Sequence, residues 1–196
     1  ARRQCVAELH GHGRWVQSVA ISQNGRAIVS GSSDYTVRIW DMATGECAGE
    51  PLHGHHGEVF SVGINEAGTL IISGSEDNSL IIWDLEVECV GDSLAERAGK
   101  VTCMAVNRER ERMVCGCSDG TLRIWDMVTA KNVVEPLQAH DRGVTNLAIS
   151  PDGQKIVSSS EDGTLRIWDM ATGKWVREAV QGHEDMLLCI AISLEG

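Results

Sequence analysis

The dipeptide Trp-Asp occurs four times along the chain, and this repeat constrains the fold more than any other feature of the sequence. The copies are spaced 42 or 43 residues apart and stand at Trp40-Asp41, Trp83-Asp84, Trp125-Asp126 and Trp168-Asp169. An aspartate precedes each of these tryptophans by six positions. A fixed period of this length is typical of proteins that stack copies of one small structural unit. The chain is therefore expected to consist of repeated units.

Each unit contains short segments that are typical of β-strands. In the first unit, residues 16–21 and 27–30 are rich in branched apolar side chains, and residues 36–40 alternate between the two faces of a strand. Asn24-Gly25 predicts the first turn, and a fourth strand is expected near residues 47–52. No stretch shows sustained helical periodicity. The pattern predicts an all-β chain with four short strands in each unit.

A Gly-His pair belongs to the same repeat. It occurs at Gly11-His12, Gly54-His55 and Gly182-His183, with Ala139-His140 as a near match. In these features the chain resembles the WD-repeat family, whose period is about 40–45 residues. The resemblance covers essentially the whole chain and implies a β-propeller built of four-stranded antiparallel blades.

The register of the repeat divides residues 1–196 into four complete blades plus one extra strand at each end, as one propeller or part of one. The blades are expected over residues 10–52, 53–94, 95–137 and 138–180, and the extra strands within 4–9 and 183–196. Three arrangements stay open: a fragment of a longer propeller, half of a ring assembled from two copies, or a small closed ring. Open strand edges would favour self-association.

The resemblance also implies a structural role for the recurring polar residues. In the family, the histidine, a second-strand Ser or Thr, the turn Asp and the third-strand Trp form a hydrogen-bonded chain. The matching residues here are His12, Ser30, Asp34 and Trp40, then His55, Ser73, Asp77 and Trp83, and finally His140, Ser158, Asp162 and Trp168. The third blade departs from the pattern, because Cys115 replaces the serine and Glu96-Arg97 replaces Gly-His. We expect it to be the least rigid blade, with Asp119 and Trp125 bound to other partners.

Ser, His and Asp together also form the triad of many hydrolases. Here the set recurs in three blades, and no nucleophile-elbow sequence surrounds the serines. The sequence therefore predicts no catalytic residue and no enzyme activity. The His pairs offer too few ligands for zinc, Cys115-Gly116-Cys117 lacks the spacer of redox motifs, and the glycines lie at turns. No metal or cofactor is expected.

Charge and cysteine content restrict the partners and the compartment. The net charge is −11 and no basic face is visible, which argues against binding to nucleic acid or to an anionic membrane. No apolar run is long enough to span a bilayer, and the start of the chain does not resemble a signal peptide. The odd count of seven cysteines favours free thiols and a cytoplasmic or nuclear location.

The candidate binding surface is inferred from the family, in which partners commonly dock on the narrow face of the propeller. The exposed positions there lie at the start of the innermost strand and just before the turn aspartate. By register they include Trp15, Gln17, Ser33, Glu58, Phe60, Glu76, Lys100 and Met186. Trp15 and Phe60 are aromatic where the third and fourth blades have small, polar or charged residues.

We expect Trp15, Phe60, Glu58 and Glu76 to form part of a site for proteins or peptides, including partly basic ones. In an equally supported alternative, Trp15 packs against the neighbouring blade. The predicted function is a non-catalytic scaffold for protein–protein interactions. The alternative function is recognition of a small ligand or a carbohydrate.

Overall fold

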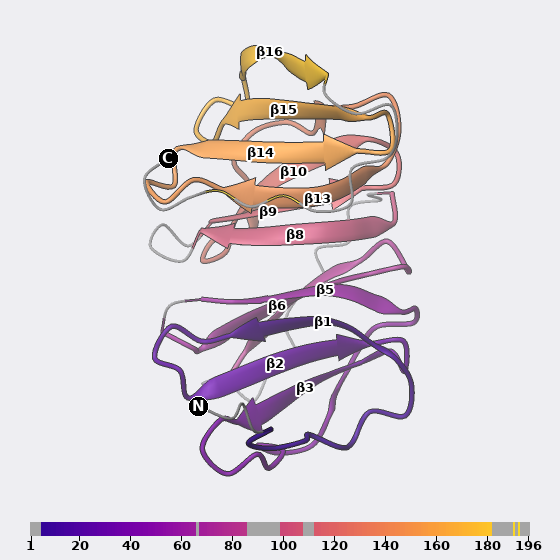
Figure 1. Ribbon diagram of the computed structural model, residues 1–196, viewed down its shortest axis with the longest axis vertical. Coiled ribbons are helices and arrows are strands. Elements are labelled where there is room, and N and C mark those ends of the chain that lie inside the picture. Colours follow the sequence, from indigo (N-terminus) through magenta and orange to yellow (C-terminus); the bar gives the residue numbers. More distant parts are fainter. Residues whose placement is uncertain are drawn as a thin grey trace.

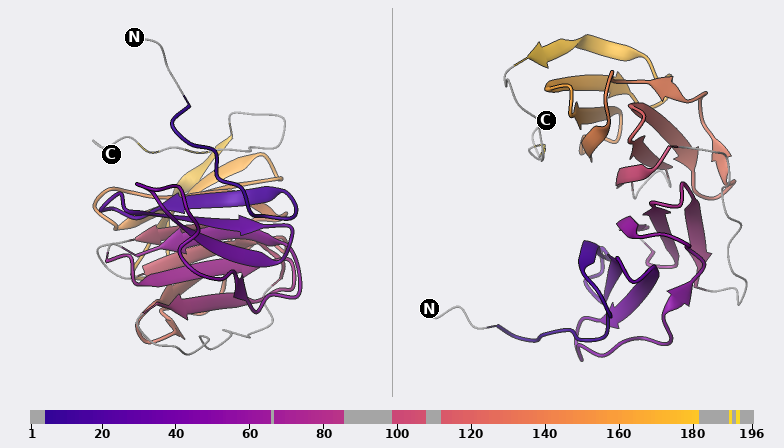
Figure 2. Two further views of the ribbon diagram at one scale, coloured as in Figure 1. Left: turned by 90° about the horizontal axis from the view of Figure 1, so that it is seen from below. Right: turned by 90° about the vertical axis from the view of Figure 1, so that its right-hand side faces the viewer.

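The computed structural model describes residues 5–65, 67–85, 99–107, 112–181, 190 and 192. Within these residues the secondary structure consists of β-strands, and no helix capable of crossing a membrane is present. The strands form four antiparallel sheets that follow one another in sequence and stand around a common centre as an open arc (Figure 2). The fold is therefore the predicted all-β, propeller-like array of WD-type blades.

Each sheet is a meander in which neighbouring strands follow one another along the chain, except that the last short strand of the third sheet pairs with the third strand of that sheet (Figure 1). The first sheet contains β1 (Val16–Ile21), β2 (Ala27–Ser32), β3 (Thr36–Asp41) and β4 (Leu52–His53), and the second contains β5 (Val59–Ile64), β6 (Leu70–Ser75) and β7 (Leu80–Asp84). The third contains β8 (Val101–Asn107), β9 (Arg112–Cys117), β10 (Thr121–Asp126), β11 (Lys131–Asn132) and β12 (Leu137–Gln138). The fourth contains β13 (Val144–Ile149), β14 (Lys155–Ser160), β15 (Thr164–Asp169) and β16 (Trp175–Gln181). The first strand of each sheet lies on the inside of the arc (Figure 2).

The outer strand of the first sheet is shorter than predicted. Residues 47–52 were expected to form it, but only an isolated bridge between Trp40 and Cys47 and the two-residue β4 are present. Gly49 has a φ of 98°, and Pro51 has no N–H to donate, so the segment between them cannot continue the ladder. The fourth strand of the second blade would fall within residues 86–98, which lie outside the described residues.

The N-terminal segment does not form the extra strand expected over residues 4–9. Residues 5–15 contain no strand, and none of the described sheets pairs with them. The expected strand within residues 183–196 lies outside the described residues apart from two isolated positions. The arc is open, so the small closed ring is wrong: the packing contacts join consecutive sheets (Figure 2).

The sheets pack against one another through a contact that recurs at each junction. A side chain at Gly31 would meet Val59 Cγ1 at 2.6 Å, and side chains at Gly74 and Gly116 would meet Val101 and Val144 at 2.5 Å. Real Cβ atoms do not approach this closely. The glycine on the second strand of one sheet therefore admits the first-strand valine of the next sheet, and this contact sets the spacing of the arc.

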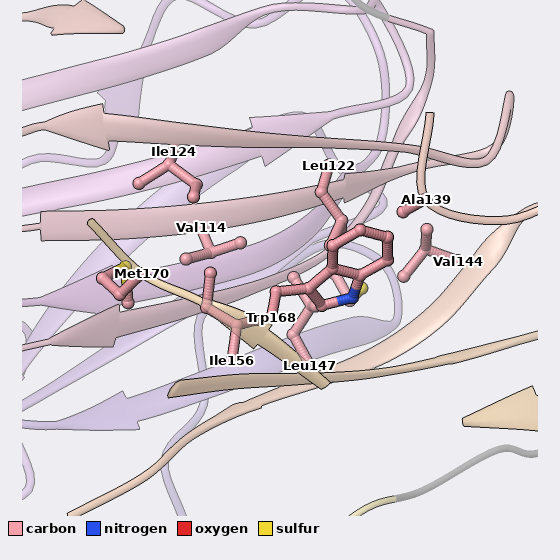
Figure 3. Close-up of a cluster of buried hydrophobic side chains, with 10 residues drawn as sticks. Val114, Leu122, Ile124, Ala139, Val144, Leu147, Ile156, Trp168 and Met170 are labelled. Carbon is pink, nitrogen blue, oxygen red and sulfur yellow. The ribbon is translucent and has the colours of Figure 1, made fainter. Parts of the chain in front are cut away.

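An apolar core fills each junction. Figure 3 shows the core between the third and fourth sheets, where Leu122 and Ile124 of β10 face Ile156 and Trp168. Each of these four side chains is at most 6% exposed. Burial of apolar side chains on this scale stabilises the array by roughly 1.5–3 kcal/mol for each large side chain.

Candidate functional site

The recurring polar residues form a chain of hydrogen bonds in three of the four sheets. In the first sheet, Trp40 Nε1 donates to Ser30 Oγ at 2.8 Å, and Ser30 Oγ lies 2.7 Å from His12 Nε2. His12 Nδ1 lies 2.9 Å from Asp34 Oδ2. The same chain occurs around His55 in the second sheet, with Ser73, Asp77 and Trp83, and around His140 in the fourth sheet, with Ser158, Asp162 and Trp168.

The two ends of each hydrogen-bonded chain have fixed roles. An indole N–H can only donate and a charged carboxylate can only accept, so the serine oxygen accepts from the tryptophan and Nδ1 of the histidine donates to the aspartate. When the histidine is neutral, its Nε2 carries no proton and accepts the hydroxyl proton of the serine.

Burial and hydrogen bonding shift the titration of these groups. Burial lowers the pKa of His55 and of His140, and the aspartate beside each histidine opposes this only in part. Burial alone would raise the pKa of Asp162, but hydrogen bonds from Thr164 and from the Asp141 amide outweigh it and lower the pKa to about 2. Near neutral pH, the carboxylates are therefore charged and these histidines neutral.

A further hydroxyl group belongs to each chain, and the sequence analysis did not include it. Thr36 Oγ1 donates to Asp34 Oδ1 at 2.6 Å, and Ser79 and Thr164 occupy the same position beside Asp77 and Asp162. The sequence does contain the signal, since a Ser or Thr follows the turn aspartate by two positions in all four units. An aspartate that bonds the backbone and hydroxyl two residues later is a common turn element.

The third sheet lacks the chain, as its sequence predicts, but the outcome for Trp125 differs from the expectation. Asp119 binds the amide and hydroxyl of Thr121. Trp125 is 4% exposed, and its Nε1 has no hydrogen-bond partner within the described part of the protein. Cys115 cannot replace the serine, because its thiol points to the Arg123 carbonyl oxygen at 3.8 Å.

The geometry of the polar chains argues against a hydrolase site. Ser30, Ser73 and Ser158 are at most 3% exposed, and each hydroxyl oxygen accepts an indole N–H. A nucleophilic serine must reach a substrate carbon from a site next to oxyanion donors, and these buried oxygens are closed off from substrate. Among the described residues, no group of three His, Cys, Asp or Glu side chains is placed to hold a metal ion.

The predicted binding positions lie at one end of all four sheets, and a repeated backbone bond fixes them there. In each sheet, the residue before the turn aspartate donates its backbone N–H to a carbonyl oxygen. The acceptor is the residue directly before the innermost strand. The bonds run from Ser33 to Trp15 at 2.9 Å, from Glu76 to Glu58 at 2.9 Å, from Ser118 to Lys100 at 2.8 Å, and from Glu161 to Gly143 at 3.0 Å. We call this end of the arc the rim.

Side chains of the rim connect the first sheet to the second. Ser33 Oγ donates to Glu58 Oε2 at 2.8 Å and accepts from Gln17 Nε2 at 2.8 Å. Gln17 also lies 3.3 Å from Glu58. The prediction that Ser33 is an exposed contact position is wrong, because these bonds hold it between the sheets and leave it 4% exposed.

A second cluster on the rim connects the second sheet to the third. Lys100 Nζ lies 2.8 Å from Glu76 Oε1 and 4.5 Å from the centre of the Phe60 ring. The ion pair is partly exposed, with 38% of the Lys100 side chain and 47% of the Glu76 side chain open to solvent. Exposed pairs of this kind contribute little to stability, about 0–1 kcal/mol.

Within the described residues, Trp15 does not pack against the adjacent second sheet. It is 82% exposed, while its backbone carbonyl is held by Ser33. Met186, the remaining predicted position, lies outside the described residues.

Known proteins match this chain in short repeated segments. The family model "WD domain, G-beta repeat" matches residues 3–41, 45–84, 89–126 and 131–169. Nuclear distribution protein PAC1 of Scheffersomyces stipitis is 53% identical over 38 residues, 19% of this chain and 7% of that protein. Vegetative incompatibility protein HET-E-1 of Podospora anserina is 51% identical over 41 residues, 21% of this chain and 3% of that protein.

A third similar protein is named as a subunit of a complex. The probable E3 ubiquitin ligase complex SCF subunit sconB of Arthroderma benhamiae is 51% identical over 39 residues, 20% of this chain and 6% of that protein. The matches thus span only 3–7% of these three relatives. The four model matches, in contrast, cover most of this chain with the same period as the polar network. The chain therefore belongs to the WD-repeat family, whose members generally act as protein-interaction scaffolds.

Proposed function

We propose that the chain is a non-catalytic scaffold that binds a protein or peptide segment on its rim. The observation that carries the proposal is the exposure of Trp15, 82%, on a backbone that the Ser33 amide holds in place. A large aromatic side chain that is exposed on a fixed backbone is typical of a binding hot spot. The absence of a usable nucleophile in the polar chains supports a binding role over an enzymatic one.

The charges of the rim favour a ligand that contains a basic residue. Among the described residues, the hydrogen-bond donors to Glu58 are the uncharged side chains of Gln17 and Ser33, which do not neutralise its charge. Glu76 is already paired with Lys100. In this proposal, Glu58 binds a basic side chain of the ligand, and Trp15 contacts an apolar side chain next to that basic residue in the ligand.

Selection of peptides from a random display library tests this proposal. The peptides selected by the wild-type chain should carry a basic residue next to an apolar one. The double variant Trp15→Ala and Phe60→Ala should lose about tenfold or more in affinity for them, which corresponds to about 1.4 kcal/mol or more. Glu58→Gln should weaken only the peptides that contain a basic residue.

Trp175→Ala provides a matched control. Trp175 is 51% exposed but lies on the outer strand β16, away from the rim. Its removal should leave peptide affinity unchanged. Equal losses in both variants, or unchanged binding by a folded double variant, would exclude the rim. Binding on a glycan array without any peptide selection would favour carbohydrate recognition instead.

The compartment is also a proposal. Five described cysteines, Cys5, Cys47, Cys103, Cys115 and Cys117, are free thiols. Burial raises the pKa of Cys103 to about 12, so this thiol is unreactive near neutral pH. Free thiols suit a reducing compartment, and we propose that the chain acts in the cytoplasm or nucleus.

A further inference from the structure

The turn after the second strand of each sheet contains one residue with a left-handed backbone conformation. In the second, third and fourth sheets this residue is Asn78, Gly120 and Gly163, with φ angles of 68°, 82° and 78°. Glycine adopts this conformation without steric cost, and asparagine adopts it more readily than most residues. In the first sheet the residue is Tyr35, with a φ of 72°. Because a bulky side chain is unfavourable at this angle, the first sheet carries backbone strain that the other three avoid.

The loop that leads to the next sheet leaves room for the side chain of Tyr35. At the same position of the third sheet, a Cβ on Gly120 would collide with the carbonyl oxygens of His140 and Arg142, which precede the fourth sheet. The first sheet also has a described neighbour after it, yet Tyr35 is 42% exposed. The residues that close over this position belong to the following sheet, so the exposure of Tyr35 does not arise from the position of its sheet at the end of the arc.

Hydrogen bonds fix the backbone on both sides of Tyr35. The Tyr35 amide donates to the Ser32 carbonyl at 3.1 Å, and the Thr36 amide donates to Asp34 Oδ1 at 3.0 Å. The Gly13 amide donates to Asp34 Oδ2 at 2.9 Å, which connects the turn to the segment before β1. The ring is therefore exposed on a backbone that is ordered before a ligand arrives, so a contact with it costs little conformational entropy.

The distribution of aromatic residues points to the same region. Four of the six tryptophans belong to the Trp-Asp repeat, and a fifth, Trp175, lies on the outer strand β16. The sixth is Trp15, at the rim. The one tyrosine and the one phenylalanine of the chain, Tyr35 and Phe60, also lie at the rim of the first two sheets. Apart from Trp175, every aromatic residue outside the Trp-Asp repeat thus lies where the ligand is proposed to bind.

We propose that Tyr35 is a second aromatic anchor for the ligand of the rim, an inference that rests on the proposed function. Strained backbone conformations persist where the surrounding structure enforces them, and they are concentrated at ligand sites. A tyrosine ring offers a large contact area with few rotatable bonds. The ligand is a protein or peptide segment with two apolar side chains, one that contacts Trp15 and one that contacts Tyr35.

The backbone geometry sets the spacing of these two side chains in the ligand. The Ser33 amide donates to the Trp15 carbonyl at 2.9 Å, and Tyr35 follows Ser33 by two residues. Opposite residues of antiparallel strands are about 5.5 Å apart and two residues span at most about 7 Å, so the Cα atoms of Trp15 and Tyr35 lie within about 13 Å. An extended ligand advances about 3.3 Å per residue, so its two apolar residues should lie within about four positions of each other.

Peptides that the wild-type chain selects from a random display library are the probes, and they should carry this pair of apolar residues. Tyr35→Asn gives the first sheet the residue type of Asn78 and should weaken binding about tenfold. Its melting temperature should stay the same or rise by about 2–4 °C, because the backbone strain is relieved. Tyr35→Phe keeps the ring and should bind within about twofold of the wild type. Asn78→Gly is the matched control at the same position of the second sheet and should leave affinity unchanged.

The opposite changes in stability and affinity distinguish an anchor from a packing residue. If Tyr35→Asn lowers the melting temperature together with the affinity, the residue packs and the proposal is overturned. Equal losses of affinity in Tyr35→Asn and Asn78→Gly, or selected peptides with a single apolar residue, would also overturn it. Unchanged affinity of Tyr35→Asn, alongside the expected loss in the double variant of Trp15 and Phe60, would remove the anchor and leave the proposed function intact. If the wild-type chain selects no peptide, the proposed function fails and the anchor fails with it.

Discussion

The second and third sheets bury the same tryptophan in two different ways. Trp83 and Trp125 are each 4% exposed and stand at the same position of the repeat. Trp83 donates to Ser73 at 2.8 Å, whereas the Trp125 N–H has no partner among the described residues. The tryptophan therefore remains buried by packing even where the hydrogen-bonded chain is lost.

Apolar packing replaces the polar chain in the third sheet. Met113, Cys115, Cys117 and Met127 belong to the same buried cluster as Trp125, and each is at most 2% exposed. These side chains bring few polar atoms that must be paired. The comparison teaches that the polar chain adds stability and a fixed geometry to a blade, while its apolar junctions are sufficient to keep the blade in the array.

The largest expected effect comes from removing the serine of the second sheet. Ser73→Ala leaves the Trp83 N–H and His55 Nε2 unpaired in a buried site, so it should lower the free energy of unfolding by about 2–4 kcal/mol. Cys115→Ala, at the same position of the third sheet, removes only a thiol and should cost about 1 kcal/mol. Urea denaturation measures both changes. Similar losses in the two variants would show that the polar chain contributes nothing beyond packing.

Replacing Trp83 and Trp125 tests the same difference between the second and third sheets, at the donor of the hydrogen bond instead of the acceptor. Trp83→Phe removes a satisfied donor and should cost about 2 kcal/mol. Trp125→Phe loses similar packing but also removes an unpaired buried N–H, so it should cost about 1 kcal/mol or less. The difference is read from denaturation midpoints at a constant m-value. A larger loss for Trp125→Phe would mean that its N–H has a partner after all.

Local pattern accounts for most of what the sequence predicts correctly. The alternation of Thr36 to Trp40 and the turn glycine at position 25 depend on neighbours in the chain, and strands and turns appear there. The bonds of Ser30 with His12 and Trp40 were implied by the resemblance to the WD-repeat family, and the structure contains them. The shortened outer strand could have been read from Gly49 and Pro51.

Features that depend on contacts between sheets were not predictable from one repeat. Ser33 is buried because Glu58, on the next sheet, reaches back to it. Val19 is 63% exposed because none of the described residues covers this face of the first sheet, whereas Val62 at the same position of the second sheet is 6% exposed. Trp125 Nε1 has no partner among the described residues because the Cys115 thiol points elsewhere, and the sequence does not determine that direction.

Restoring the serine in the third sheet should give a smaller effect of the opposite sign. Cys115→Ser offers the Trp125 N–H an acceptor, and the new hydroxyl can donate to the Arg123 carbonyl as the thiol does now. We expect a gain of about 1 kcal/mol in the free energy of unfolding. In a Trp125→Phe background the gain should disappear, because no N–H remains to be paired. A gain that persists in that background would assign it to packing.

The pH dependence of stability should show the smallest effect. It comes from the sheets that contain the hydrogen-bonded Trp-Ser-His-Asp chain. Burial lowers the pKa of His55 and His140 below the 6.5 of the unfolded chain, so the unfolded state binds protons first as the pH falls. Stability is therefore constant above about pH 6.5 and decreases below it until the folded histidines also titrate. A second decrease should follow between about pH 4 and pH 2, where Asp162, with its pKa lowered to about 2, loses its charge. Denaturation midpoints measured from pH 8 to pH 3 should show the two decreases in this order. A midpoint that rises between pH 6.5 and pH 5 would contradict the prediction. It would show that the folded histidines are charged and that Nε2 donates to the serine.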